Sequence, residues 1–294
     1  MPRRPWYSPI ALAQRFFIYL AVGYLVLYAF LYFEQNSLLY PGAHGNLVLS
    51  TEEATHQARL AGLVPWEHPT AGSSGPQGYV RLDFAGPTPR GTIVMFHGNG
   101  EWSAERPENV SAFTRRGFRV FLYEYPGYGG RPGYPDEKGI VSDARALIRS
   151  LDQAGFGPVY VWGESLGSGV SAAVCADPTL PVHGLALLMP WDTLAHAALS
   201  HYPFFPISLL LREKYDSLAN LEHFKHPICI VHGNEDPVIP SSLSLNLFAH
   251  LPDPKKIILE KGYGHGDWPR EANLSWWDDV LNFIAPPERA LVGR

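Results

Sequence analysis

The chain has 294 residues, of which 46% are hydrophobic and 17% charged, so it can bury one large core without a bias toward disorder. Its net charge of −5, without a cluster of Lys and Arg among aromatic residues, argues against a nucleic-acid partner. The histidines lack the spacing of a metal site, and none is predicted. Cys175 and Cys229 lie in separate apolar segments, which is typical of buried thiols.

The first apolar run, FFIYLAVGYLVLYAFLYF at residues 16–33, predicts a transmembrane signal anchor. It has no charge, and a helix of that length at about 1.5 Å per residue approaches the roughly 30 Å of a bilayer core. The run ends in Leu31, Tyr32 and Phe33 instead of small residues, which favours an uncleaved anchor. A cleaved signal peptide and a buried or interfacial helix are the alternatives.

The charges that flank this run predict its orientation. Arginines precede the run and Glu34 follows it, so the positive-inside rule places the short N-terminus, residues 1–15, in the cytoplasm. Residues 34–294 are then expected on the extracytoplasmic side. We expect a periplasmic domain on a bacterial inner membrane, although a eukaryotic endomembrane also fits. The arginines are Arg3, Arg4 and Arg15.

The remainder of the chain has the pattern of an α/β domain. Residues 42–89 are rich in Gly, Pro and Ser and contain one plausible edge strand at residues 78–84. From residue 92 onward, apolar runs alternate with helical segments, which predicts a mostly parallel sheet with helices on both faces. Strands are predicted at residues 92–98, 118–127, 158–163, 184–190, 227–233 and 255–260, and helices at 137–155, 165–177 and 241–251.

One interval, residues 191–226, interrupts this alternation. It contains several aromatic residues and prolines and no predicted strand. Because it directly follows the carboxyl end of a strand, where open α/β sheets bind ligands, we interpret it as a small helical cap over a site. A packed connection without that role is the alternative.

The sequence GESLG at residues 163–167 is the strongest indication of function. A strand ends here and a helix begins, so Ser165 lies on a tight turn that forces its backbone into a strained conformation. Gly163 and Gly167 lack the Cβ atoms that would collide with neighbouring backbone. The hydroxyl should project from the top of the sheet, where the helix N-terminus also points. Ser165 is therefore the predicted nucleophile.

A serine nucleophile needs a base, and the base needs a carboxylate that orients it. Where the serine sits on such a turn, the acid and the histidine follow it in that order along the chain. Asp236 follows a later strand, and His265 lies in a glycine-rich loop past the next strand. Glu235 competes with Asp236 for the acid role, whereas Asp267 is too near His265 in sequence to orient it easily.

An acyl-transfer site also needs hydrogen-bond donors for an oxyanion. The backbone N–H of Leu166, directly after the serine, is one candidate. The backbone N–H of Asn99, in the loop after an early strand, is the other. His97, in the same loop, is interpreted as a loop-stabilising residue.

Together these motifs resemble the α/β-hydrolase superfamily. The resemblance is greatest to a membrane-anchored branch with eukaryotic depalmitoylase-like proteins and bacterial esterase-like or aminopeptidase-like hydrolases. It implies that Ser165 is the nucleophile, His265 the general acid and base, and Asp236 the orienting acid, with Leu166 and Asn99 as oxyanion donors. The similarity extends from about residue 92 to 284 and rests on HGNG at 97–100, EYPGYGGRPGYPDEKG at 124–139, GESLG at 163–167, the segment 214–240 and GYGHGD at 262–267.

Three positions depart from the pattern of the resembling family. Glu124 stands where that family usually has Asp, Gly130 where it commonly has Ser, and Gly266 where it often has Asn. None belongs to the predicted catalytic set. The first two lie in the loop that the family places beside the nucleophile, so they bear on which substrate is accepted.

The expected function is a serine hydrolase that cleaves an ester or thioester through an acyl-enzyme intermediate and requires no cofactor. The anchor, the aromatic residues of 191–205 and the apolar residues 209–211 favour an acyl or lipid-like substrate at the membrane. Small soluble esters, and peptides or amides, are alternative substrates. A catalytically silent protein of the same fold that binds a ligand or partner is the alternative from another class.

Overall fold

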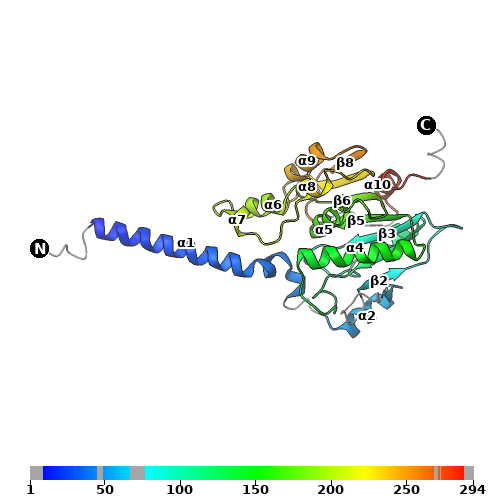
Figure 1. The fold of residues 1–294 in the computed structure, drawn as a ribbon, viewed down its shortest axis with the longest axis horizontal. Helices are drawn as coiled ribbons and strands as arrows, with labels where there is room; N and C mark the ends of the chain where they lie inside the picture. The colour runs from blue at the N-terminus through cyan, green and yellow to red at the C-terminus, as the bar shows by residue number, and fades with distance from the viewer. Residues whose placement is uncertain (1–8, 45–48, 67–76, 268–270, 272, 288–294) are drawn as a thin grey trace, which may run out of the picture.

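The centre of the computed structural model, which describes residues 9–44, 49–66, 77–267, 271 and 273–287, is a sheet (Figure 1). Its eight strands follow the order β1-β2-β4-β3-β5-β6-β7-β8. Pairs from β4 through β8 are parallel, whereas β2 is antiparallel to both neighbours. The strands are β1 (Val64–Trp66), β2 (Gly78–Arg81), β3 (Gly91–Phe96), β4 (Phe118–Tyr123), β5 (Val159–Glu164), β6 (Val182–Leu188), β7 (Ile228–Gly233) and β8 (Lys255–Glu260).

The two antiparallel strands correct one prediction. Residues 78–84 were expected to form an edge strand, but β2 lies between β1 and β4 and pairs with both. The edge is β1, whose three residues are too few to show a periodic pattern. The six strands predicted beyond residue 92 are all present in parallel order, so the mostly parallel sheet is confirmed.

Helices cover both faces of the sheet because successive strand side chains point to opposite sides. In β3, Val94 and Phe96 belong to one buried cluster, with residues of α4, α5 and α9, while Ile93 and Met95 belong to the other, with residues of α2, α3 and α10. The helices are α2 (Thr51–Leu60), α3 (Pro107–Thr114), α4 (Glu137–Gln153), α5 (Leu166–Cys175), α9 (Ser241–His250) and α10 (Trp276–Ile284).

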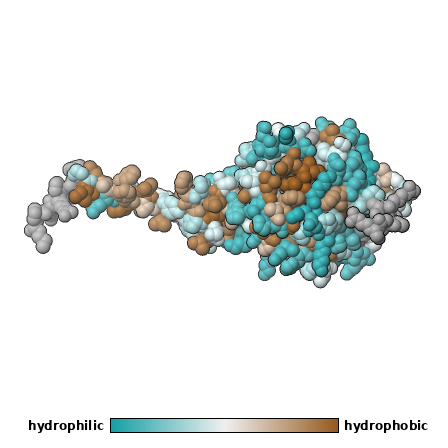
Figure 2. Space-filling model, turned by 90° about the horizontal axis from the view of Figure 1, so that it is seen from above, coloured by the Kyte–Doolittle hydropathy of each residue, from teal (hydrophilic) through white to brown (hydrophobic). Residues whose placement is uncertain are grey.

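The N-terminal helix α1 (Pro9–Leu39) projects away from this domain, as Figure 1 shows. Its 31 residues at about 1.5 Å each make it roughly 46 Å long, and its apolar part includes the predicted run 16–33. Hydrophobic side chains are exposed along it (Figure 2). By length and composition α1 is a candidate membrane span. A single 3₁₀ turn, η1 (Pro41–Ala43), follows it.

Between β6 and β7 the chain forms three short helices, α6 (Leu194–His201), α7 (Ile207–Leu210) and α8 (Ser217–Leu221). We call residues 191–226 the helical insertion. Leu221 of α8 packs in the core with residues of α5, whereas α6 and α7 extend beside the C-terminal half of α1 (Figure 1). Tyr24 of α1 makes this contact, because its hydroxyl donates to the Phe204 carbonyl at 3.1 Å.

The cysteines lie where buried thiols were predicted. Cys175 ends α5 and Cys229 lies in β7, and both are free and buried. Burial raises the pKa of the Cys229 thiol to about 12, so it stays protonated at neutral pH.

Candidate active site

The turn predicted at Ser165 is a single residue long. Strand β5 ends at Glu164 and α5 begins at Leu166, and Ser165 between them has φ 53° and ψ −115°. This region of backbone space is strained for a residue with a side chain. The N–H of Ser165 donates to the Leu188 carbonyl of neighbouring β6 at 2.9 Å, which holds the turn in place.

The two flanking glycines are required by close backbone contacts. A Cβ atom at Gly163 would lie 2.3 Å from the Gly167 carbonyl oxygen. A Cβ at Gly167 would lie 2.1 Å from the carbonyl oxygen of Phe96, at the end of β3. Any larger residue would push α5 away from the sheet and move the serine hydroxyl with it.

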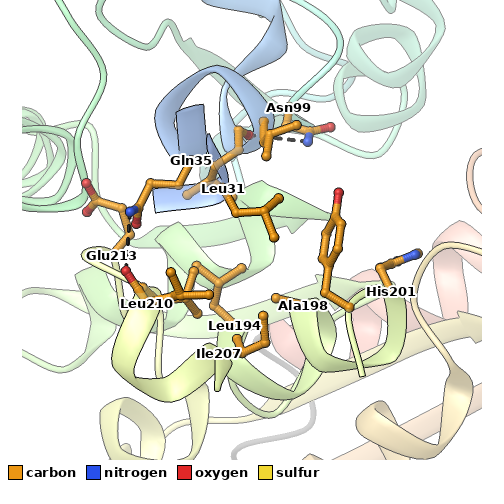
Figure 3. Close-up of a pocket in the computed structure, with 13 residues that line it drawn as sticks. Leu31, Gln35, Asn99, Leu194, Ala198, His201, Ile207, Leu210 and Glu213 are labelled. Atoms are coloured by element: carbon orange, nitrogen blue, oxygen red, sulfur yellow. Dashed lines mark hydrogen bonds between the residues drawn. The ribbon is translucent and has the colours of Figure 1, made fainter. Parts of the chain in front are cut away.

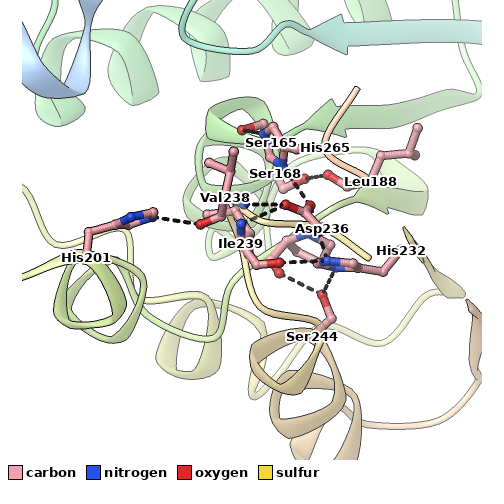
Figure 4. Close-up of polar contacts among 11 residues, drawn as sticks. Ser165, Ser168, Leu188, His201, His232, Asp236, Val238, Ile239, Ser244 and His265 are labelled. Carbon is pink, nitrogen blue, oxygen red and sulfur yellow. Dashed lines mark hydrogen bonds and ion pairs between the residues drawn. The ribbon is translucent and has the colours of Figure 1, made fainter. Parts of the chain in front are cut away.

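Ser165, His265 and Asp236 lie in one hydrogen-bonded chain (Figure 4). His265 Nε2 is 2.9 Å from Ser165 Oγ, and His265 Nδ1 is 2.7 Å from Asp236 Oδ2. The three residues follow the carboxyl ends of β5, β8 and β7, so the parallel sheet brings them to one edge. A histidine in this position can take a proton from the serine hydroxyl while its other nitrogen donates to the carboxylate.

The structure distinguishes between the candidate carboxylates. Asp236 is buried and contacts His265, whereas the side chains of Glu235 and Asp267 are exposed. The other oxygen of Asp236, Oδ1, accepts from the N–H groups of Val238 and Ile239, each at 2.8 Å. The sequence left Glu235 open as the acid, and the geometry favours Asp236.

Hydrogen bonding keeps Asp236 ionised. Burial alone would raise the pKa of this carboxyl, but bonds from His232, His265 and the N–H of Ile239 outweigh it and hold the pKa well below its usual range. A permanent negative charge beside His265 would stabilise the protonated form of its imidazole.

His232 is a site residue that the sequence analysis missed. It is fully buried in β7, with Nδ1 2.5 Å from Ser244 Oγ and Nε2 3.0 Å from the Ile239 carbonyl (Figure 4). Nε2 also lies 3.3 Å from Asp236 Oδ2. A histidine within an apolar run resembles a core residue, and only its place four residues before Asp236 could have indicated this contact.

Leu166 and Asn99 flank the serine on two different elements. Leu166 is the first residue of α5, where backbone N–H groups have no partner within the helix. Asn99 lies in the loop after β3 and, with Ser165 and His265, lines a cavity of about 250 Å³. Leu166 thus adjoins Ser165 in the chain, and Asn99 lines the same cavity as Ser165.

His97 and Glu124 brace the loop that carries Asn99. His97 is buried, with Nδ1 2.8 Å from the Gly98 carbonyl and Nε2 3.0 Å from Glu124 Oε1. The other oxygen of Glu124 accepts from the N–H and hydroxyl of Ser103, at 3.1 and 2.8 Å. Although burial alone would lower the pKa of His97, its bond to Glu124 raises it.

A close contact explains why glycine stands at position 130, where the resembling family commonly has Ser. Its φ is 76°, and a Cβ atom there would lie 2.6 Å from the Cα of Thr51, at the start of α2. The Thr51 hydroxyl donates to the Gly130 carbonyl at 2.6 Å. Gly130 therefore allows α2 to begin against this loop.

The described part of the chain contains no cluster of metal-ligating side chains. Among those residues, no group of three or more His, Cys, Asp or Glu side chains is placed to hold a metal ion.

Comparison with known proteins relates this chain to one family. The family model described as alpha/beta hydrolase fold matches residues 91–212. An uncharacterized protein of Mycobacterium tuberculosis is 31% identical over 253 residues, which cover 85% of this chain and 81% of that protein. The lysophosphatidylserine lipase ABHD12 of Mus musculus is 30% identical over 176 residues, 53% of this chain and 44% of the lipase. The chain thus spans less than half the length of that lipase.

Solved structures share the architecture at low sequence identity. Est1E from Butyrivibrio proteoclasticus with bound ferulic acid has a TM-score of 0.59 at 16% identity, covering 70% of this chain and 93% of that structure. A monoacylglycerol lipase from Paleococcus ferrophilus has a TM-score of 0.52 at 19% identity, covering 71% and 98%. At such identities the likeness concerns the fold alone.

Proposed function

Because the chain belongs to the α/β-hydrolase family, we propose that it is a serine hydrolase that cleaves carboxylic ester or thioester bonds through an acyl-enzyme intermediate. The observation that carries this proposal is the hydrogen-bonded chain from Asp236 through His265 to Ser165. Its supporting context is the strained turn at Ser165, which exposes the hydroxyl beside the N-terminus of α5.

The proposed reaction has two halves. In the first, Ser165 Oγ attacks the carbonyl carbon while His265 Nε2 takes the hydroxyl proton, and the backbone N–H groups of Leu166 and Asn99 stabilise the oxyanion. The ester or thioester bond then breaks, and the leaving alcohol or thiol takes the proton from His265. In the second half, His265 deprotonates a water that attacks the acyl carbon, and the bond to Ser165 Oγ breaks as His265 returns the proton to that oxygen and the acid is released.

Lipid-like substrates are the favoured class. The relatives include a lysophosphatidylserine lipase, and α1 is long and apolar enough to hold the domain at a membrane. We place the N-terminus in the cytoplasm and the domain on the extracytoplasmic side, because arginines precede the apolar run and Glu34 follows it. A membrane-held hydrolase meets its substrate in the bilayer.

Labelling with a fluorophosphonate probe tests the mechanism directly, because the probe reacts only with an activated serine. We compare membranes that carry the wild type, Ser165→Ala, His265→Ala and the control Ser142→Ala, an exposed serine on α4. Wild type and control are expected to be labelled and the two site variants to remain unlabelled. Folded wild-type protein that neither labels nor hydrolyses acyl esters would instead indicate a silent binding protein.

A further inference from the structure

A second cavity, of about 280 Å³, lies between α1 and the helical insertion (Figure 3). Leucine side chains from α1 form one wall, and apolar residues of α6 and α7 form the other. Its lining is mostly apolar, apart from polar residues such as Gln35, His201 and Glu213, and a mostly apolar lining is typical of a site for a hydrocarbon chain. The apolar residues on these walls include Leu31 and Leu38 of α1 and Leu194, Ala198, Ile207 and Leu210 of the insertion.

This cavity adjoins the one that contains Ser165. Asn99 lines both, and in Figure 3 it lies at the edge of the apolar cavity near Leu31. An acyl chain held between α1 and the insertion would therefore end near the residue proposed to stabilise the oxyanion. The ester carbonyl would lie where the two cavities meet.

The segment beside the apolar cavity is positioned to enter the membrane. Residues 202–211, YPFFPISLLL, contact α1 at Tyr24, whose ring stacks on Phe205 with centroids 5.0 Å apart. Tyr24 lies nine residues before the end of the run 16–33, which places the contact about 14 Å inside a bilayer at about 1.5 Å per residue. Phe204 and Leu209 are 85% and 77% exposed, which suits lipid better than water.

Hydrogen bonds between Arg212 and the end of α1 mark the boundary between the apolar segments and the rest of the domain. The N–H of Arg212 donates to Gln35 Oε1 at 2.8 Å, and its guanidinium donates to the Tyr32 carbonyl at 2.8 Å. Gln35, which follows the apolar run of α1, and Arg212, which follows residues 202–211, therefore lie beside each other. Residues 202–211 would lie within the outer half of the bilayer, and the domain beyond Gln35 in water.

The cavity around Ser165 has a different character. Its lining includes three glutamates, Glu101, Glu105 and Glu164, and one arginine, Arg106, which is paired with Glu101. Three carboxylates around one neutralised guanidinium give this cavity a net negative charge. A phosphate or carboxylate headgroup would be repelled here, whereas hydroxyl groups can donate to the carboxylates.

Building on the serine hydrolase function proposed above, we propose that the substrate is a long-chain monoacyl lipid with an uncharged, hydroxyl-bearing headgroup. Its acyl chain enters from the bilayer into the cavity between α1 and the insertion, and its headgroup occupies the acidic cavity. The bond from Ser165 Oγ to the acyl carbon forms as the ester C–O bond breaks. The headgroup alcohol leaves with a proton from His265, and water then releases the fatty acid.

The test uses the full chain in phosphatidylcholine vesicles with a long-chain monoacylglycerol and p-nitrophenyl acetate as substrates. Ala198→Trp fills the apolar cavity, and Ala195→Trp on the same helix, outside the cavity lining, is the control. The ratio of long-chain to short-chain turnover should fall at least about tenfold in Ala198→Trp and remain at the wild-type value in Ala195→Trp. An unchanged ratio in Ala198→Trp overturns the acyl site, although the serine hydrolase function then stands.

The headgroup is tested with lysophosphatidylserine of the same acyl chain. Wild type should prefer monoacylglycerol by about tenfold or more, and Glu105→Lys should reduce this preference. Glu222→Lys, the same charge change at an exposed residue directly after α8, should leave it unaltered. A wild-type preference for lysophosphatidylserine overturns the uncharged headgroup. Failure of wild type on every ester, with no probe labelling, would contradict the proposed function itself.

Discussion

Asn99 and Leu39 are hydrogen bonded: Nδ2 of Asn99 donates to the carbonyl of Leu39, the last residue of α1, at 3.3 Å. The carbonyl of Asn99 in turn accepts from the N–H of Gly42 and from the hydroxyl of Tyr128, both at 3.0 Å. The loop proposed to stabilise the oxyanion is therefore fastened to the end of the candidate membrane helix.

Tyr128→Phe removes one of these bonds and keeps the ring in place. The peptide group of Asn99 loses part of its support, so kcat is expected to fall about fivefold with KM little changed, which corresponds to about 1 kcal/mol. Steady-state kinetics measure this, with exposed Tyr134→Phe as the matched control. Equal kinetics of all three proteins would show that this bond does not position the donor.

Asp236→Asn removes the carboxylate that orients His265. Without it the wrong imidazole tautomer is favoured and the imidazolium is not stabilised, so kcat should fall by roughly 10⁴. Glu235→Gln, the adjacent exposed carboxylate, should retain activity. The acid assignment is wrong if Glu235→Gln is the inactive variant and Asp236→Asn the active one.

His232→Phe tests whether the buried histidine of β7 positions Asp236. The substitution removes the imidazole nitrogens that lie near Ser244, Ile239 and Asp236. We expect kcat to fall about tenfold because the carboxylate loses a neighbouring donor, and His232→Gln to recover part of the loss. A lower melting temperature with unaltered kcat in the Phe variant would assign His232 a structural role alone.

The substitution Glu124→Gln should remove the part of the pH dependence of the free energy of unfolding that comes from His97. The folded pKa of His97 is raised by Glu124, so this group binds more protons in the folded than in the unfolded state above about pH 6.5. Its contribution to the free energy of unfolding is complete at lower pH and is lost as the pH rises through the folded pKa.

Urea unfolding of both proteins in detergent, between about pH 6 and about pH 9, measures this dependence. The stability advantage of the wild type over Glu124→Gln should shrink as the pH rises. A constant difference across the range would mean that His97 does not gain a proton on folding.

The orientation of the anchor is tested with a reporter fused to the C-terminus in a bacterial host. Because the positive residues precede the apolar run, we expect alkaline phosphatase fused there to be active and green fluorescent protein to be dark. The opposite pattern would place the domain in the cytoplasm and contradict the predicted topology.

Local patterns in the sequence were sufficient for much of this structure. The apolar run 158–163, the glycines around Ser165 and the following helix predicted the strand, turn and helix that the structure contains. They were sufficient because strand periodicity, helix periodicity and the Cβ-free turn depend on residues near one another in the chain. The mostly parallel sheet followed from the repetition of these same units.

Contacts between distant segments were decided only by the tertiary structure. The sequence left Glu235 and Asp236 both open as the acid, whereas folding buries only Asp236 beside His265. It also placed β2 at the sheet edge, because the three-residue strand β1 that covers it has no readable pattern. The bond between Asn99 and α1 joins segments 60 residues apart, and no local periodicity encodes such a pairing.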